Sequence, residues 1–323
     1  MTPWLDAFVP AFGLLALGAL LRRRLLPDPA FWSGAERLVF YALLPCLLAG
    51  AIAAVDLSRL PFGGMALSAW GALAAGTALS LLLARGFGLG HAATTSVLQG
   101  GIRFNTIMAL AVAGGVFGAP GLAFGAVATG LIVPAVQVIT TLAFALGRDA
   151  PGGAPGGTTP AAAPGTAHRA RPRIPGALRQ VASNPLILGC AAGFALSALG
   201  GLPPGAGPLV RALGGASVAL GLLTVGAALG AGALRDRVPV QAATTALKLL
   251  VMPALTLALA RLLGVDPLPA AVLALFMAMP TAPTAYVQAR LMGGDAPLVA
   301  ATTTAQHLAA ALTLPLWALL LGL

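Results

Sequence analysis

Charged residues are scarce in this sequence, and acidic residues are the scarcest. Only 8% of the 323 residues are Asp, Glu, Lys or Arg, whereas a soluble domain carries roughly 25% to keep its surface in water. The chain is instead 59% apolar, with a mean hydropathy of +0.94. Lipid is the solvent that suits such a chain, so the sequence excludes a soluble domain and predicts an integral membrane protein.

The residue types that build catalytic, redox and metal sites are few as well. The two cysteines, Cys46 and Cys190, lie inside apolar runs, and the three histidines are far apart in the sequence. The sequence has no His-Glu-x-x-His, Cys-x-x-Cys or Gly-x-Ser-x-Gly motif, and no nucleophile is paired with a base. We therefore expect no enzyme activity, no metal site and no cofactor, and we interpret His307 as a satisfied residue of the helix bundle.

The net charge of +10 is scattered between long apolar segments. A nucleic-acid-binding surface needs a basic patch, so we expect no nucleic-acid partner. The first apolar run follows no basic region and precedes no convincing cleavage site, so we expect a retained membrane span there and not a signal peptide.

Apolar segments of membrane-spanning length fill most of the chain. Roughly 20 helical residues cross the hydrocarbon core of a bilayer, and charges or turn signals separate the segments. The expected spans are 7–21, 38–55, 62–84, 91–117, 122–146, 185–198, 209–234, 238–263, 269–290 and 297–321. The sequence therefore predicts an all-α polytopic membrane protein with about ten transmembrane helices.

Arginines in the short loops predict the orientation. With the N-terminus outside, thirteen arginines fall on the cytoplasmic side and three on the outer side, while Arg103 and Lys248 remain inside spans. We therefore expect both termini outside the cytoplasmic membrane. The Pro-, Gly- and Thr-rich residues 147–180 cannot bury apolar surface, so we expect a flexible cytoplasmic linker between the halves 1–146 and 181–323.

Five spans on each side of the linker predict an inverted repeat. An odd number of spans puts the two halves in opposite orientations, as in many secondary transporters. Superposing Leu122 on Leu298 gives an offset of 176 residues, and this offset lays residues 103–106 on residues 279–282. Two unusual polar stretches, in the fourth and ninth spans, thus fall at matching places.

The ninth span contains two prolines, Pro280 and Pro283, three residues apart. Each proline removes a backbone donor and clashes with the carbonyl four residues earlier. One interpretation is a simple kink, relieved by Thr281 and Thr284. The other is a broken helix that lines a binding site, because free backbone groups at membrane depth are tolerated only in protein or beside water.

The fourth span contains Arg103 about 12 residues, or roughly 18 Å, from its start. A charge at that depth marks a functional site by default, although Arg103 also has the alternatives of snorkelling to an interface or of neutralisation by carbonyls of the ninth-span break. Asn105 donates and accepts hydrogen bonds, which suits a carboxylate ligand. A broken helix would also aim the N-terminus of a half-helix at an anion.

Lys248 is the one lysine of the sequence and lies about 10 residues into the eighth span. Its long stem leaves two interpretations open, a binding site or a snorkelling side chain. All eight acidic residues fall in loops or at span edges, whereas cation sites and proton relays in membranes usually use buried carboxylates. Two buried positive charges without a buried acid favour an anionic ligand.

Several sequence segments, taken together and in order, resemble the auxin efflux carrier family, whose bacterial members include malate and malonate permease-like proteins. They are Leu17-Gly18 before the basic cluster, residues 38–45, Arg103-Phe104-Asn105, residues 184–189, residues 226–229, Lys248 to Pro253, and Met279 to Tyr286. The resemblance covers nearly the whole chain outside the linker. One departure is that the plant carriers have a proline at the fourth-span break, where this chain has Phe104.

The resemblance implies two inverted five-helix repeats with broken, crossing helices 4 and 9. Spans 1, 2, 6 and 7 would form a scaffold, often dimeric in this fold, and spans 3–5 and 8–10 a transport domain that moves like an elevator. Asn105 would contact the substrate carboxylate, and Pro280, Thr281 and Pro283 would form the second break. The complete set of expected substrate-binding residues is Arg103, Asn105, Thr106, Lys248, Pro280, Thr281, Pro283 and Tyr286.

These observations favour a secondary transporter that moves small carboxylates, such as malate, malonate or auxin-like acids, by alternating access in a bacterial cytoplasmic membrane. Two alternatives remain open. One is a sodium- or proton-coupled symporter of the bile-acid symporter type. The other is a membrane sensor that binds its ligand without moving it. The expected partners are the carboxylate, the lipid bilayer and a second copy of the chain through the scaffold.

Overall fold

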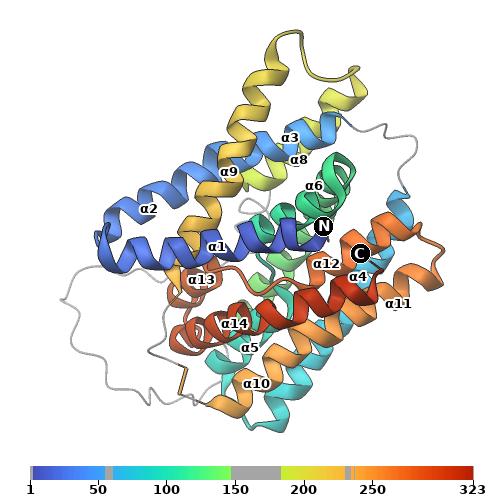
Figure 1. Cartoon of the computed structure of the whole chain (residues 1–323). Helices are drawn as coiled ribbons and strands as arrows, with labels where there is room; N and C mark the ends of the chain where they lie inside the picture. Colours follow the sequence, from blue (N-terminus) through green and yellow to red (C-terminus); the bar gives the residue numbers. More distant parts are fainter. Residues whose placement is uncertain (1–2, 55–60, 147–182, 230–233, 236, 323) are drawn as a thin grey trace.

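The computed structural model describes residues 3–54, 61–146, 183–229, 234–235 and 237–322, and every regular element in these residues is a helix. The predicted linker, 147–180, lies outside them. Figure 1 shows the arrangement. The elements are α1 (Pro3–Arg24), α2 (Pro29–Leu38), η1 (Val39–Leu43), α3 (Leu44–Ala53), α4 (Phe62–Gly86), α5 (His91–Ile102), α6 (Thr106–Leu146), α8 (Pro185–Ala198), α9 (Ala206–Ala228), α10 (Val238–Ala246), η3 (Leu247–Val251), α11 (Met252–Leu262), α12 (Pro267–Ala278), α13 (Thr284–Met292) and α14 (Ala296–Leu320).

The predicted all-α polytopic membrane fold is confirmed. Five helical stretches are long and apolar enough to cross a bilayer, and two shorter apolar helices accompany them. The five are Pro29–Ala53, Phe62–Gly86, His91–Phe144, Ala206–Ala228 and Val238–Leu262. The expected boundaries at 117–122 are marked by Gly118, whose φ of 64° interrupts α6.

Two expected span boundaries were wrong. The second span begins at Pro29 and not at residue 38, because Asp28 caps α2 by accepting a hydrogen bond from the Ala30 N–H at 2.8 Å. The seventh span ends at Ala228 and not at residue 234, since Leu229 has an extended backbone (φ −73°, ψ 130°). Local capping and backbone conformation decide both ends.

Two wide, π-helical turns, η1 and η3, directly precede helices that carry a proline in their first turn, Pro45 and Pro253. Pro253 has no N–H to offer the carbonyl of Leu249 four residues earlier. The indole Nε1 of Trp317 in α14 donates to that carbonyl at 2.8 Å instead. A side chain from a distant helix thus satisfies the backbone group that the proline leaves free.

Helices α1, α3, α8 and α9 pack through glycines. A Cβ at Gly18 of α1 would lie 2.1 Å from the Leu223 carbonyl oxygen of α9, and one at Gly226 of α9 would lie 2.0 Å from the Leu15 carbonyl oxygen of α1. Gly189 of α8 approaches the backbone of Pro45 at the start of α3 in the same way. Small residues of this kind let membrane helices approach closely.

The helix pairs α1–α9 and α3–α8 match the symmetry of an inverted repeat. In span order, α1 of the first half corresponds to α8 of the second, and α3 corresponds to α9. The counterpart of the α1–α9 pair is therefore the α8–α3 pair, and both pairs are in contact. The shorter helices repeat as well. Helices α5 and α12 have 12 residues each, and both their first and their last residues differ by the offset of 176 that the sequence predicts.

Figure 1 shows α2, α3, α8 and α9 on one side of the molecule and α4, α10, α11 and α14 on the other, with α5, α6 and α12 among them. Helix α6 contacts both groups, since it packs against α3, α8 and α9 as well as α4. Helices α5 and α12, the first halves of the broken spans, pack against α4 and α14 of the second group.

Candidate functional site

The fourth and ninth spans are both broken at the positions that the sequence predicts. Helix α5 ends at Ile102, and Arg103 has an extended backbone (φ −75°, ψ 156°) before α6 begins at Thr106. Helix α12 ends at Ala278, and Met279 has nearly the same conformation (φ −71°, ψ 143°) before α13 begins at Thr284. The ninth span is thus a broken helix, and the interpretation as a simple kink is wrong.

The two breaks contact each other directly. The backbone N–H of Asn105 in the first break donates to the Pro280 carbonyl in the second at 2.8 Å. In return, the Thr281 hydroxyl donates to the carbonyl of Gly100, in the last turn of α5, at 3.1 Å. Each break therefore satisfies backbone groups that the other leaves free, which buried backbone in a membrane requires.

Gln306 of α14 bridges the same two breaks. Its Nε2 donates to the Gly100 carbonyl at 2.9 Å, and its Oε1 accepts from the Thr281 N–H at 2.8 Å. The side chain is fully buried. We call the place where the two breaks, residues 103–105 and 279–283, contact each other the crossing. A single amide supplies both a donor and an acceptor to it, so α14 is part of the site.

Asn105 caps the half-helix that leaves the crossing. Its Oδ1 accepts from the Met108 N–H at 3.2 Å, which is the bond of an N-cap residue to the third residue of its helix. This bond orients the amide so that Nδ2 faces Nε2 of His307, 3.4 Å away. Because Nδ1 of His307 lies 2.8 Å from the Thr303 carbonyl and must donate to it, Nε2 is an acceptor and the neutral ring satisfies both neighbours.

The first break forms without a proline. Close packing at Gly100 and Gly101 fixes the end of α5, since a Cβ at Gly100 would lie 2.8 Å from Cγ2 of Thr244 and one at Gly101 would lie 2.2 Å from Oγ of Ser80. Phe104, which stands where the plant carriers have proline, is buried with its ring centroid 5.6 Å from that of Phe276 in α12. Phe104 therefore anchors the break by packing across the crossing.

The two cations inside spans differ in their surroundings. Arg103 is partly buried, and its Nη1 donates to Oε1 of Gln99 at 3.0 Å. Lys248 in η3 is 0% exposed, and its Nζ has no hydrogen-bond partner in the part of the chain that the structure describes. A side chain that snorkels keeps its charged end in water, so the structure does not place Lys248 in that way.

The other expected site residues lie at the half-helix ends or beyond them. Thr106 is the first residue of α6, and Pro283 precedes the first residue of α13. The first N–H groups of a helix have no partner within it, so both half-helices direct partial positive charge at the crossing. Tyr286 is 38% exposed, and no hydrogen bond of its hydroxyl joins it to the described crossing.

Sequence reasoning missed Gln306 and His307 as parts of this site. The available signal was the polar run Thr302-Thr303-Thr304 beside Gln306-His307 in an otherwise apolar span. All five of these side chains are buried. A band of buried polar residues in a membrane span indicates a functional site or polar groups on a neighbouring helix that these residues contact.

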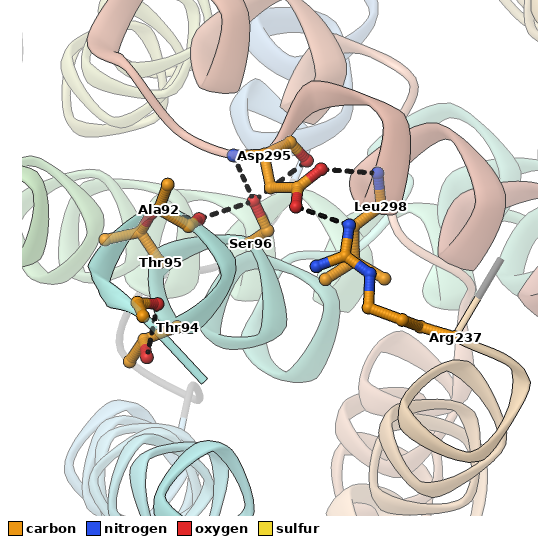
Figure 2. Close-up of polar contacts among 8 residues, drawn as sticks. Ala92, Thr94, Thr95, Ser96, Arg237, Asp295 and Leu298 are labelled. Carbon is orange, nitrogen blue, oxygen red and sulfur yellow. Dashed lines mark hydrogen bonds and ion pairs between the residues drawn. The ribbon is translucent and has the colours of Figure 1, made fainter. Parts of the chain in front are cut away.

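A second polar cluster ties α5, α10 and α14 together at one end of these helices (Figure 2). The N–H of Asp295 lies 3.1 Å from the Ala92 carbonyl and 2.9 Å from Oγ of Ser96, both in the first turns of α5. The Asp295 carboxylate accepts from the Leu298 N–H at 3.0 Å, which caps α14, and pairs with Arg237. The loop between α13 and α14 is thereby fixed to α5 and α10.

The C-terminal part of the chain matches a known family. Residues 171–318 match the family model described as "Mem_trans: Membrane transport protein". This part of the chain is similar to the auxin efflux carriers, the family that the model describes. The match includes α8 to α14, and with them the second break, Lys248, Gln306 and His307. No curated protein matches the chain.

The match, together with the apolar helices, supports a multi-pass membrane transporter that takes a small-molecule substrate and lies in the lipid bilayer. Among the described residues, no group of three or more His, Cys, Asp or Glu side chains is arranged to hold a metal ion. The described groups at the crossing are hydrogen-bond donors, half-helix N-termini and the side chain of Arg103.

Gln306→Leu is expected to destabilise the carrier by about 1–3 kcal/mol, the cost of one buried unsatisfied backbone group. The Gly100 carbonyl keeps the Thr281 hydroxyl as donor, so the main loss is the partner of the Thr281 N–H. Thermal unfolding in detergent measures the change, with Gln288→Leu on α13 as the control. An unchanged unfolding temperature would mean that Gln306 does not support the crossing.

Asp295→Asn and Asp295→Ala separate the two roles of this carboxylate. Asn keeps an acceptor for the Leu298 N–H, and the lost ion pair contributes at most about 1 kcal/mol because its side chains are 35% and 18% exposed. Ala loses the cap too, which costs about 1 kcal/mol more. Unfolding temperatures should therefore fall in the order wild type, Asn, Ala, and equal values for the two variants would exclude a capping role.

Proposed function

We propose that this carrier moves small organic anions, namely carboxylates such as malate, malonate or auxin-like acids, and binds them at the crossing of the two broken spans. The observation that supports this most directly is the charge balance of the crossing. Arg103 and Lys248 lie inside spans, whereas no Asp or Glu occurs within α5, α12 or α14, and Asp295 and Asp266 lie at the far ends of α14 and α12. A carboxylate on the substrate supplies the missing negative charge.

The geometry of the half-helices favours the same ligand class. Helices α6 and α13 begin at the crossing, and helix N-termini bind anions through their free N–H groups and their dipole. Asn105 is 1% exposed and presents its amide beside the start of α6. Its Nδ2, 3.4 Å from Nε2 of His307, is a donor for a carboxylate that enters between the half-helices.

Transport follows from the packing of the two groups of helices. We assign spans 1, 2, 6 and 7, which are α1, α2 with η1 and α3, α8 and α9, to a scaffold. We assign α4–α6 and α10–α14 to a transport domain that carries the crossing across the bilayer like an elevator. For the transport domain to slide, its interface with the scaffold must not be locked by hydrogen bonds or ion pairs. The membrane is the cytoplasmic membrane with both termini outside, and two copies associate through the scaffold.

Two alternatives make different predictions. A sodium-coupled symporter of the bile-acid symporter type needs oxygen ligands for the ion, and the crossing has backbone carbonyls but no carboxylate. A sensor would bind the anion without moving it. Sodium-dependent uptake favours the first alternative, and ligand binding without flux in liposomes favours the second.

Thermal stabilisation of the purified carrier by a panel of mono- and dicarboxylates tests the proposal. A ligand that binds only the folded state at about 100 times its Kd adds about 2.7 kcal/mol of stability. We expect at least one carboxylate to raise the unfolding temperature of the wild type and not that of Arg103→Gln. The matched control is Arg261→Gln, which alters an exposed arginine at the end of α11. Stabilisation by neutral or cationic compounds alone would overturn the anion assignment.

A further inference from the structure

Lys248 is buried among helices that offer it no counter-charge. It lies in η3, which contacts α4, α5, α10, α11, α12 and α14. None of these helices contains an Asp or Glu between its first and last residue. With 0% exposure and no hydrogen bond in the described part of the chain, the ammonium form of this side chain is uncompensated.

The side chain belongs to the face of the eighth span that meets the crossing. Thr244, one turn before Lys248, contacts Gly100, and Leu247 lies against Gly101. Several other buried polar atoms in these helices also have no partner in the described residues, namely Nε2 of Gln99, Oγ1 of Thr245 and Oγ1 of Thr303. Unfilled hydrogen-bonding capacity on α5, α10 and α14, the helices that η3 contacts, indicates a place for a polar ligand.

The other titratable or charged groups on these helices do not exchange a proton with a ligand at the crossing. His91, Arg85 and Arg261 lie at helix ends away from the crossing. Arg103 keeps its charge in proteins. His307 already satisfies both of its ring nitrogens in the neutral form, through Thr303 and Asn105.

We propose that Lys248 carries a proton together with the anion, so that the carrier is a proton–anion symporter whose coupling group is an amine instead of a carboxylate. This inference rests on the proposed function. When the anion binds, the neutral amine takes up one proton and the ammonium pairs with the carboxylate. When the anion leaves, the proton leaves too, and the empty transport domain returns with an uncharged lysine in its core.

The proton balance is complete with the substances already named. On the side of the membrane from which the anion enters, one proton adds to the lone pair of the Lys248 Nζ. On the other side of the membrane the same proton departs with the anion. No bond of the substrate changes. The energetic reason is that moving an unpaired buried charge across the hydrocarbon core is costly in either direction, whereas a paired or a neutral group crosses more easily.

Because Lys248 is the one lysine in the sequence, its protonation state is directly measurable. Protein labelled with ¹³C and ¹⁵N lysine, purified with a lysine-free tag, gives one side-chain signal whose Cε and Nζ shifts distinguish amine from ammonium. At neutral pH we expect the amine without ligand and the ammonium with saturating malonate or malate. An ammonium signal in the anion-free protein overturns the inference, whether or not transport is seen.

Uptake in proteoliposomes gives the second test. We expect an inward proton gradient to drive accumulation of radiolabelled malonate or malate at least tenfold above the value without a gradient, with alkalinisation of the outer medium. Lys248→Arg, which keeps the cation but cannot release its proton, should lose this gradient-driven accumulation.

The two hypotheses fail in different ways. Uptake that is indifferent to the proton gradient and moves no protons overturns the role of Lys248 and leaves the proposed function intact. If neither acid is taken up by the wild-type protein under any gradient, the proposed function fails for these acids, and the anion-free spectrum still decides the state of Lys248. Should Lys248→Arg fail to fold, the wild-type spectrum and proton flux decide.

Discussion

Gly226→Ala is expected to prevent the carrier from folding to a stable form. The new Cβ would lie 2.0 Å from the Leu15 carbonyl oxygen and 2.7 Å from the Leu15 carbonyl carbon. These are backbone atoms in the middle of α1, so no side chain can move aside and the two helices must separate. Overpacking in a rigid interior costs about 1–3 kcal/mol, and occasionally more, and we expect the upper end here because Gly18 forms the reciprocal contact with Leu223.

Gly215→Ala in the same helix is the matched control. A Cβ at Gly215 meets no atom within 4 Å, and alanine favours a helix over glycine by about 1 kcal/mol. The yield of monodisperse protein and the unfolding temperature should therefore fall sharply for Gly226→Ala and stay equal or rise for Gly215→Ala. Similar behaviour of the two variants would contradict the close α1–α9 contact.

Asn105→Ala is expected to weaken anion binding and to lower stability. The substitution removes both the amide that faces His307 and the cap on the Met108 N–H. Loss of the cap costs about 1 kcal/mol. Loss of a hydrogen bond to a charged ligand costs about 1.5–3 kcal/mol of binding free energy, which corresponds to a weakening of roughly tenfold to a hundredfold.

Asn105→Ser separates the two effects. Serine is as good an N-cap residue as asparagine, so its hydroxyl keeps an acceptor for the Met108 N–H, but it has no amide to donate to a carboxylate. We expect near wild-type unfolding temperature for Asn105→Ser together with the same loss of carboxylate-induced stabilisation as in Asn105→Ala. Full ligand response in the serine variant would mean that Asn105 has a capping role only.

The sequence predicted the position of both breaks because their chemistry is local. Pro280 and Pro283 remove backbone donors from one span, and Arg103 with Asn105 places polar groups in the other. The common offset of 176 then agrees with the observed ends of α5 and α12. Backbone disruption is encoded within a few residues, so it is visible without knowledge of tertiary contacts.

The partners of the breaks could not be predicted in the same way. Gln306 and His307 are adjacent residues of one apolar helix, and which face of α14 meets the crossing depends on how α5, α12 and α14 pack. The amide of Gln306 reaches Gly100 and Thr281, which lie about 200 and 25 residues away along the chain. Likewise, the sequence around Tyr286 does not indicate that its hydroxyl makes no hydrogen bond to the described crossing.

Several residues behind the family resemblance are now explained by packing. Gly18, Gly189 and Gly226 are the glycines at which helix backbones touch. Pro253 is the proline whose missing donor is replaced by Trp317. These residues therefore support the arrangement of the helices, whereas Arg103 and Asn105 lie at the site itself.

Counterflow in proteoliposomes shows whether the carrier moves carboxylates across the membrane. Vesicles that contain the purified carrier are loaded with unlabelled malonate or malate and diluted into trace radiolabelled acid. We expect transient accumulation of label in wild-type vesicles, and little or none in vesicles with Asn105→Ser, a variant that we expect to fold. If wild-type vesicles do not accumulate any carboxylate that stabilises the protein, the crossing binds anions without moving them, and the carrier assignment is contradicted.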